Sequence, residues 1–219
     1  MTASAATTTV LPDPSFRALL GEFAWRRLVP AVRARFAVKP APGTAILYRG
    51  TMHEVRASWA GKLLAEICRL FGTPLAPYCG SDVPVSVRLH LASDGNGIVW
   101  ERTYHFARRA PVTCVSVKRA ESSGLVEIVG GGLGLALSLA ERDGALHFRS
   151  TGYFWHWRRR RLPLPRWLTP GEINVVHADL GNGRFRFAIA VAHPLFGEII
   201  RQDGVFVDER RQRWTACCC

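Results

Sequence analysis

The chain has 219 residues, of which 48% are hydrophobic and 21% are charged, and its formal net charge is +12. A chain of this length and composition can bury a core of its own, so it needs neither a metal nor disulfides to fold. The longest apolar run, Leu133–Ala140, is too short to span a bilayer, which excludes a helical membrane protein and favours a soluble, cytoplasmic one.

The positive charge comes almost entirely from arginine, because Lys39, Lys62 and Lys118 are the only lysines. A basic surface attracts nucleic-acid phosphates or anionic lipid headgroups. The arginines are scattered along the chain rather than gathered on one helix, so the pattern does not favour nucleic acid as a partner.

The two ends of the chain differ from its middle. Residues 1–14 are small and polar and predict a disordered leader without a secretory signal, residues 15–210 predict a single domain, and residues 211–219 predict a flexible tail. In that tail Cys217, Cys218 and Cys219 are adjacent and cannot easily converge on one tetrahedral zinc. The histidines also lack metal-ligand spacing, so we expect no metal and no cofactor.

Helices are expected near the N-terminus. The first begins at Asp13-Pro14, a second runs over Pro30–Phe36, and the clearest begins after Ser58, a good N-cap, and ends at Gly72 and Pro74. The first and last of these carry apolar stripes at helical spacing, formed by Phe16, Leu19, Leu20 and Phe23 and by Trp59, Leu63, Ile67, Leu70 and Phe71.

Strands dominate the rest of the chain. Gly43–Ala57 looks extended, with a bulge or bend expected at Gly50, and from Val83 onward apolar residues recur at every second position. Hairpins are predicted at Gly181–Gly183 and at Asp203-Gly204. Further strands are predicted at 83–91, 98–106, 112–119, 125–129, 133–140, 145–157, 173–180, 184–192, 196–202 and 205–208.

The connections are too short for crossover helices, so the sheet should be antiparallel. About seven to nine such strands would curl rather than stay flat. The predicted fold is therefore α+β: a strongly curved antiparallel sheet or open β-barrel with two or three N-terminal helices that cover its mouth or one face.

One strand places a charge among apolar residues. Trp100, Arg102 and Tyr104 share a face, and Glu127 and Glu198 similarly lie between apolar neighbours. A buried arginine needs a partner, so Arg102 could grip an anionic group in a cavity while a carboxylate orients it or transfers a proton. The alternative is a structural ion pair, or an arginine that reaches water at the sheet edge.

Aromatic residues precede a cationic run later in the chain. Trp155 and Trp157 are followed by Arg158, Arg159, Arg160 and Arg161, a combination that suits a lipid headgroup region or stacked bases. In a strand these charges alternate between two faces, which favours a solvated strand end instead.

Two other patterns do not support catalysis. Gly130–Gly134 precedes a strand and lacks a phosphate-loop lysine, so it predicts a turn. His177 and Asp179 share a strand face, but no serine or cysteine is placed to complete a triad.

The order of several short motifs resembles a known family. These motifs are F-R-A-L-L-G-E-F from Phe16, Arg49-Gly50, W-x-R-x-Y-x-F from Trp100, L-V-E from Leu125, P-L-P-x-W-L-x-P from Pro163, and a final segment from Gly183 to Gly197. Together they resemble a bacterial domain-of-unknown-function family that occurs alone or C-terminal to saccharopine-dehydrogenase-like domains.

That resemblance implies a domain without an assigned activity. It draws attention to Trp100, Arg102, Glu127 and the loop Pro163–Pro170, and it implies that a redox-enzyme partner would bind in trans. The Arg158–Arg161 run and the cysteine tail are not part of the family pattern.

Three hypotheses follow. The first is a small-molecule or lipid-binding module in which Trp100, Arg102, Tyr104, Glu127 and Glu198 line a cavity for a hydrophobic or anionic molecule. The second is an enzyme acting on a hydrophobic acid or ester, with Glu127 or Glu198 as acid/base beside Arg102. The third is an accessory protein that docks on a membrane or a redox enzyme through Trp155, Trp157 and Arg158–Arg161.

Overall fold

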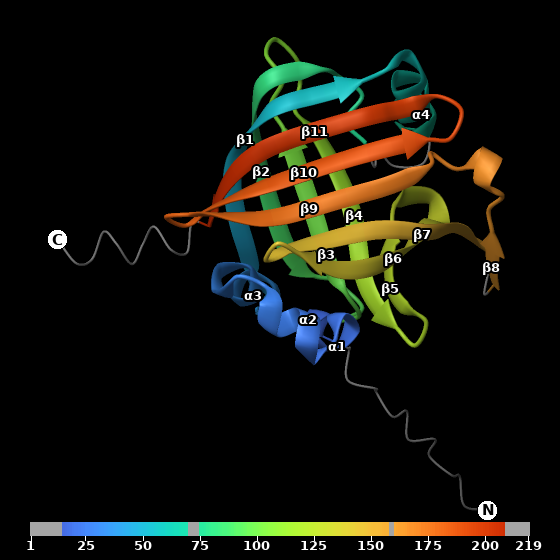
Figure 1. Cartoon of the computed structure of the whole chain (residues 1–219). Helices are drawn as coiled ribbons and strands as arrows, with labels where there is room; N and C mark the ends of the chain where they lie inside the picture. Colours follow the sequence, from blue (N-terminus) through green and yellow to red (C-terminus); the bar gives the residue numbers. More distant parts are fainter. Residues whose placement is uncertain (1–14, 70–74, 158–159, 209–219) are drawn as a thin grey trace, which may run out of the picture.

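The strands form one antiparallel sheet that closes into a barrel. The computed structural model describes residues 15–69, 75–157 and 160–208. The sheet has 11 strands in the order β6-β5-β4-β3-β2-β1-β11-β10-β9-β7-β8, and a further pairing of β6 with β7 closes it (Figure 1). Because β8 pairs only with β7, ten strands form the wall and β8 is an extension.

Most strands of the wall are long, and most are joined by tight turns. The bounds of all the strands, the extension β8 included, are β1 Ala45–Ala57, β2 Gly80–Leu91, β3 Ile98–Tyr104, β4 Val112–Glu121, β5 Gly124–Ile128, β6 Leu133–Arg142, β7 Ala145–Trp157, β8 Arg160–Pro163, β9 Glu172–Gly181, β10 Arg184–His193 and β11 Gly197–Asp208. The barrel is thus larger than the seven to nine strands predicted, and it is closed rather than open.

The alternating pattern of the sequence lines the inside of the barrel. Along β10, Phe185, Phe187, Ile189 and Val191 are buried, while the intervening residues are more accessible. Such a period of two is what a strand with one buried face requires. The antiparallel prediction is confirmed.

Two expectations at the β1–β11 seam are wrong. Asp203-Gly204 does not turn, because both residues lie inside the single strand β11, where Gly204 pairs with Met52. Gly50 is not the bulge, which lies between Met52 and Glu54; instead the Phe206 ring packs where a Cβ on Gly50 would be. Both glycines therefore serve close packing rather than chain reversal.

Three short helices, α1 Phe16–Leu20, α2 Glu22–Arg27 and α3 Pro30–Ala37, cover one end of the barrel (Figure 1). The expected single stripe from Phe16 to Phe23 is interrupted, because Gly21 has a positive φ of 84° and separates α1 from α2. Phe23 is consequently 78% exposed. Ser15 caps α1, and the expected start at Asp13-Pro14 lies outside the described residues.

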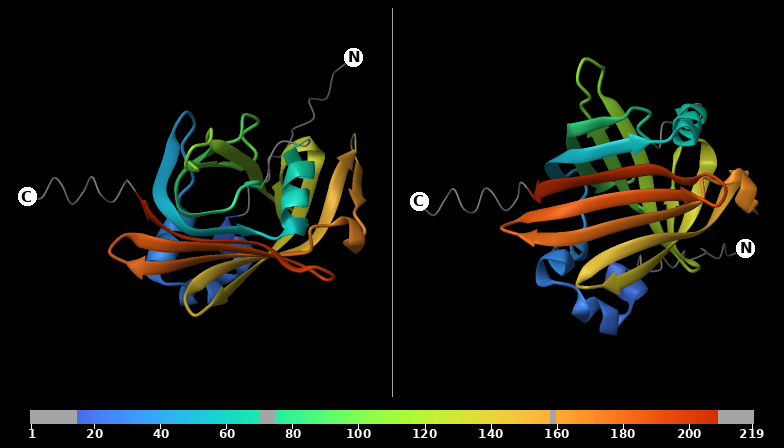
Figure 2. Two further views of the ribbon diagram at one scale, coloured as in Figure 1. Left: turned by 90° about the horizontal axis from the view of Figure 1, so that it is seen from above. Right: turned by 45° about the horizontal axis from the view of Figure 1, so that its top comes forward.

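The helix α4, Trp59–Arg69, lies at the opposite end of β1 from α3 (Figures 1 and 2). Its predicted cap is confirmed, because Ser58 Oγ accepts a hydrogen bond from the Gly61 amide at 3.2 Å. The predicted end at Gly72 and Pro74 lies outside the described residues. None of the helices in the described ranges is long and apolar enough to cross a membrane.

Candidate functional site

The barrel encloses a cavity of about 240 Å³, which is much more than one water molecule needs. Leu64, Ile67 and Cys68 of α4 border it at one end, and Phe148, Phe187 and other apolar side chains form its walls. A smaller space of about 40 Å³ lies towards α3, where Phe16 and Phe36 border it.

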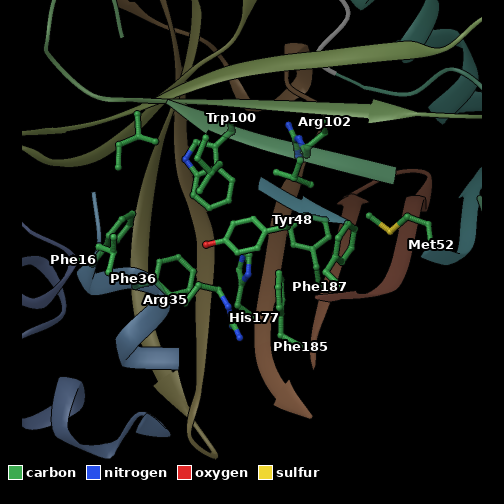
Figure 3. Close-up of a pocket in the computed structure, with 15 residues that line it drawn as sticks. Phe16, Arg35, Phe36, Tyr48, Met52, Trp100, Arg102, His177, Phe185 and Phe187 are labelled. Atoms are coloured by element: carbon green, nitrogen blue, oxygen red, sulfur yellow. The ribbon is translucent and has the colours of Figure 1, made fainter. Parts of the chain in front are cut away.

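Four side chains line both spaces and therefore lie between them: Trp100, Arg102, His177 and Phe187. Three of these carry polar groups into an otherwise apolar interior (Figure 3). These three polar side chains, Trp100, Arg102 and His177, form the centre of the candidate site.

Arg102 enters the cavity from β3. The guanidinium lies inside the barrel, its accessible surface faces the cavity, and Nε is fully buried without a hydrogen-bond partner. Among the residues the structure describes, none forms an ion pair or hydrogen bond with this side chain. Burial would lower the pKa of Arg102, but interactions with Tyr104 and Glu127 outweigh it, so the pKa is raised and the guanidinium stays charged.

Lys118 and Glu127 form an ion pair beside Arg102. They are direct partners in the register of β4 and β5, and Nζ lies 2.8 Å from Oε1. Nζ also lies 4.7 Å from the centroid of the Trp100 ring, which adds a cation–π contact. Burial lowers the pKa of Lys118; for Glu127, the charges of Lys118 and Arg102 outweigh burial and hold the pKa below its usual value.

The charged groups of the cavity do not balance. Arg102 and Lys118 carry two positive charges and Glu127 one negative charge, which leaves one net positive charge among the described residues that line it. Cys114 does not supply the missing negative charge, because burial raises the pKa of its thiol to about 11. An anionic group bound beside Arg102 would restore neutrality.

His177 adds a neutral polar group. Its ring contacts Phe36, Phe187 and Phe148 at centroid distances of 5.0, 5.1 and 5.8 Å. Burial, followed by the charges of Arg35, Lys118 and Arg102, lowers its pKa well below the usual value. His177 Nδ1 and Trp100 Nε1 are both buried without hydrogen-bond partners in the described part of the chain, so each is free to bond a ligand.

Among the described residues, no three His, Cys, Asp or Glu side chains lie close enough to hold an ion. Asp179, which shares a strand face with His177 in the sequence, instead lies 4.0 Å from Arg35.

Of the five residues predicted to line the cavity, three do so: Trp100, Arg102 and Glu127. Tyr104 is buried on the same face of β3, but it does not border either space, and its hydroxyl donates a hydrogen bond to Gln202 Oε1 at 2.7 Å.

The prediction for Glu198 is wrong. This residue lies near the N-terminal end of β11 and is exposed. Its Oε2 lies 2.6 Å from Nη2 of Arg201, with which it forms an ion pair. Its apolar sequence neighbours suggested an interior face, but Phe196 precedes the strand and is itself 51% exposed. The register of β10 and β11 shifts between Val191 and Ala192, so Ile199 is an extra residue in β11, and the alternation that holds for Ile200 does not continue to Glu198.

The aromatic and cationic segment lies on β7 and β8. Trp155 is 40% exposed, and Arg160 is exposed on β8. Arg161 pairs with Glu121, and its guanidinium lies 4.7 Å from the Phe154 ring centroid. Arg158, Arg159 and the Trp157 side chain lie outside the described residues. A docking role for this segment stays a prediction.

Two residues of the site, Lys118 and His177, were not predicted to line a cavity. A signal for Lys118 was present, because it follows Cys114 and Ser116 at alternate positions of β4. Small interior side chains on one strand leave space inside a barrel, and a charge at the next interior position then faces that space.

The fold and its interior define a class: a closed antiparallel β-barrel with a charged, internal cavity. The chain belongs to the family described as Domain of unknown function (DUF4166), whose sequence model matches residues 28–206. The match begins just before α3 and ends in β11, so it includes every residue of the site. No match is found among curated proteins or among solved structures.

Proposed function

We propose that the chain is a binding module for a mainly apolar molecule with one anionic group, such as a fatty acid or a related amphiphile. The observation that carries the proposal is the Arg102 guanidinium, which lines the cavity without an ion pair or hydrogen bond to any described residue; the carboxylate that acts on it, Glu127, is already paired with Lys118. A buried charge without a partner is strongly unfavourable, and a bound anion would remove that penalty.

The surrounding groups fit the same kind of ligand. Trp100 Nε1 and His177 Nδ1 are unpaired in the described part of the chain, and both border the cavity beside Arg102. A carboxylate has enough lone pairs to accept a bond from the guanidinium and another from a neighbouring donor. The apolar walls would take the hydrocarbon part of the molecule.

The acid/base hypothesis receives less support. A proton donor needs a raised pKa, whereas the pKa of Glu127 is lowered and its carboxylate is held by Lys118. Its role in the proposal is to hold Lys118, so that Arg102 is the cation left for the ligand.

The test uses cis-parinaric acid, a fluorescent fatty acid, together with its methyl ester. We expect the wild type to bind the acid more tightly than the ester. Arg102→Met should weaken binding of the acid by about tenfold or more, because a hydrogen bond to a charged group contributes about 1.5–3 kcal/mol. Binding of the ester should change little.

A matched control removes an arginine on the outer surface. Arg88 lies on β2, next to β3, is exposed, and pairs with Glu101 at 3.3 Å. Arg88→Met should leave acid binding unchanged. Equal affinity of the wild type and Arg102→Met for the acid would overturn the proposal.

A further inference from the structure

The helix α4 packs Leu64 on the barrel but leaves three other large apolar side chains exposed. Trp59, Leu63 and Ile67 are 69%, 56% and 47% exposed. The face that meets the barrel is formed by smaller residues: Gly61, Ala65 and Cys68 are buried, and a Cβ on Gly61 would lie 2.1 Å from the Ile199 carbonyl oxygen. An amphipathic helix normally buries its larger apolar side chains, so this outward face needs something to cover it.

The exposed face of α4 continues on both sides. Trp59 contacts Phe196 at the β10–β11 turn, with ring centroids 5.3 Å apart. On the other side, Ile67 and Leu168 both border the main cavity, and Leu168 lies in the short helix η2, Arg166–Leu168. We call this surface the apolar rim; its members are Trp59, Leu63, Ile67, Phe196, Trp167 and Leu168, and each is at least 47% exposed.

The cavity lies directly behind part of the apolar rim. Ile67 and Leu168 are exposed to solvent and also border the cavity, so whatever covers the rim also covers this side of the cavity. A ligand that leaves a hydrophobic phase at the rim would enter the barrel without crossing water.

The charge near the apolar rim favours one kind of surface. Exposed Lys62 precedes Leu63 and exposed Glu66 precedes Ile67, so the basic excess beside the rim comes from exposed Arg166, which precedes Trp167; the whole chain has a net charge of +12. Tryptophan and leucine side chains next to basic ones are the combination that binds at the headgroup level of an anionic bilayer.

We infer that the apolar rim docks on the surface of an anionic lipid bilayer, with the side of the cavity that Ile67 and Leu168 border facing the lipid. Docking itself depends only on the rim and its basic neighbours. The further step, that the bilayer supplies the ligand, rests on the proposed function. The rim consists of other residues than Trp155, Trp157 and Arg158–Arg161, the segment that the sequence suggested.

Flotation of the full chain with lipid vesicles tests the inference. The vesicles are phosphatidylcholine with or without phosphatidylserine. We expect the wild type to float with the anionic vesicles, and the combined variant Trp59→Ala, Leu63→Gln and Trp167→Ala to bind them about tenfold or more weakly, because less apolar surface enters the interface. These side chains are exposed, and circular dichroism verifies that the variant folds.

The control variant combines Phe23→Ala with Leu180→Gln. Both side chains are exposed, at 78% and 45%, but neither belongs to the rim. Phe23 is on α2, and Leu180 is in β9 near the start of β10, whereas Phe196 follows the end of β10. It should bind like the wild type. The inference is overturned if the wild type does not float, or if the rim variant floats equally well. It is also overturned if the wild type forms a dimer that does not bind vesicles and that the rim variant, but not the control variant, disrupts.

The two proposals can fail separately. Arg102→Met leaves the rim intact and should float like the wild type while losing the acid. A wild type that floats but does not bind cis-parinaric acid would refute the cavity proposal and leave docking in place.

Discussion

Arg102 and Glu127 share the interior of the barrel, but among the described residues only Glu127 forms an ion pair there, with Lys118. Removing that carboxylate by Glu127→Gln leaves Lys118 and Arg102 as two unbalanced positive charges. We expect the free energy of unfolding to fall by about 3–5 kcal/mol, the usual penalty for breaking a buried pair. Urea denaturation measures this change.

The matched control for that substitution is Glu198→Gln. It breaks an exposed pair of similar N–O distance, 2.6 Å against 2.8 Å, and should change stability little because solvent screens the charges. Equal losses of unfolding free energy in the two variants would mean that the Lys118–Glu127 pair is screened by solvent as an exposed pair is.

His177 predicts a pH dependence. Its folded-state pKa is depressed from 6.5, so the unfolded chain binds the proton more readily. Its contribution to stability is therefore present above pH 6.5 and is lost as the pH falls towards the folded pKa. Over the range from about pH 6 to 5, the wild type should lose up to about 1.4 kcal/mol per pH unit more than His177→Phe does.

Urea denaturation at several pH values measures this difference. Phe187 and Phe36 surround the ring, so phenylalanine keeps an aromatic side chain in the packing. The other histidines are common to both proteins and cancel in the comparison. Parallel stability profiles would show that the imidazole of His177 titrates normally.

Two charged residues of the site could be predicted from the sequence. An arginine and a glutamate at interior positions of alternating strands identified Arg102 and Glu127, because a charge on an apolar face needs an explanation. Alternation does not say how deep along the barrel a residue lies, so Tyr104 was expected in the cavity although it bonds Gln202 instead. The Lys118 ion pair depends on the β4–β5 register, which requires the pairing of two strands to be known.

At the scale of elements, the β1–β11 seam depends on glycine. A Cβ on Gly204 would lie 2.5 Å from the Thr51 carbonyl oxygen and 2.7 Å from Met52 Sδ. Gly204→Ala should therefore force the strands apart and destabilise the protein by about 1–3 kcal/mol. Gly152→Ala, in β7 and with nothing within 4 Å of the new Cβ, should be neutral or slightly stabilising, and thermal denaturation compares the two.

Gly204 also explains the hairpin that was predicted wrongly. Asp-Gly between apolar runs is a strong turn signal, but a glycine in the middle of a strand gives the same letters when a neighbouring strand approaches closely. A similar ambiguity affects α4: its period was predicted correctly, but a period does not say which face is buried. The small residues Gly61, Ala65 and Cys68, with Leu64, form the face that meets the barrel, so Trp59 and Leu63 face outward.

At the scale of the molecule, the antiparallel sheet and its curvature followed from short connections and alternating residues. Closure did not, because it depends on β7 pairing with both β6 and β9, while β8 extends the sheet outside the closed wall. β7 pairs with β6 along its length, with β9 through Leu146–Arg149, and with β8 through Phe154–Trp157. No local pattern records that one strand exchanges its neighbour along its length.

The closed barrel also predicts how a ligand affects the stability of the whole molecule. The cavity lies between strands that are far apart in the chain, β3, β4, β5 and β9, so it does not exist in the unfolded state. A ligand at about 100 times its Kd should therefore stabilise the fold by about 2.7 kcal/mol. Differential scanning calorimetry with cis-parinaric acid should show this as a rise in Tm for the wild type and for Arg88→Met, and a much smaller rise for Arg102→Met. If the Tm of Arg102→Met rises as much as that of the wild type, the acid binds elsewhere on the protein. Only an acid that binds in the barrel interior contacts the Arg102 guanidinium, so only then does the substitution reduce the rise in Tm.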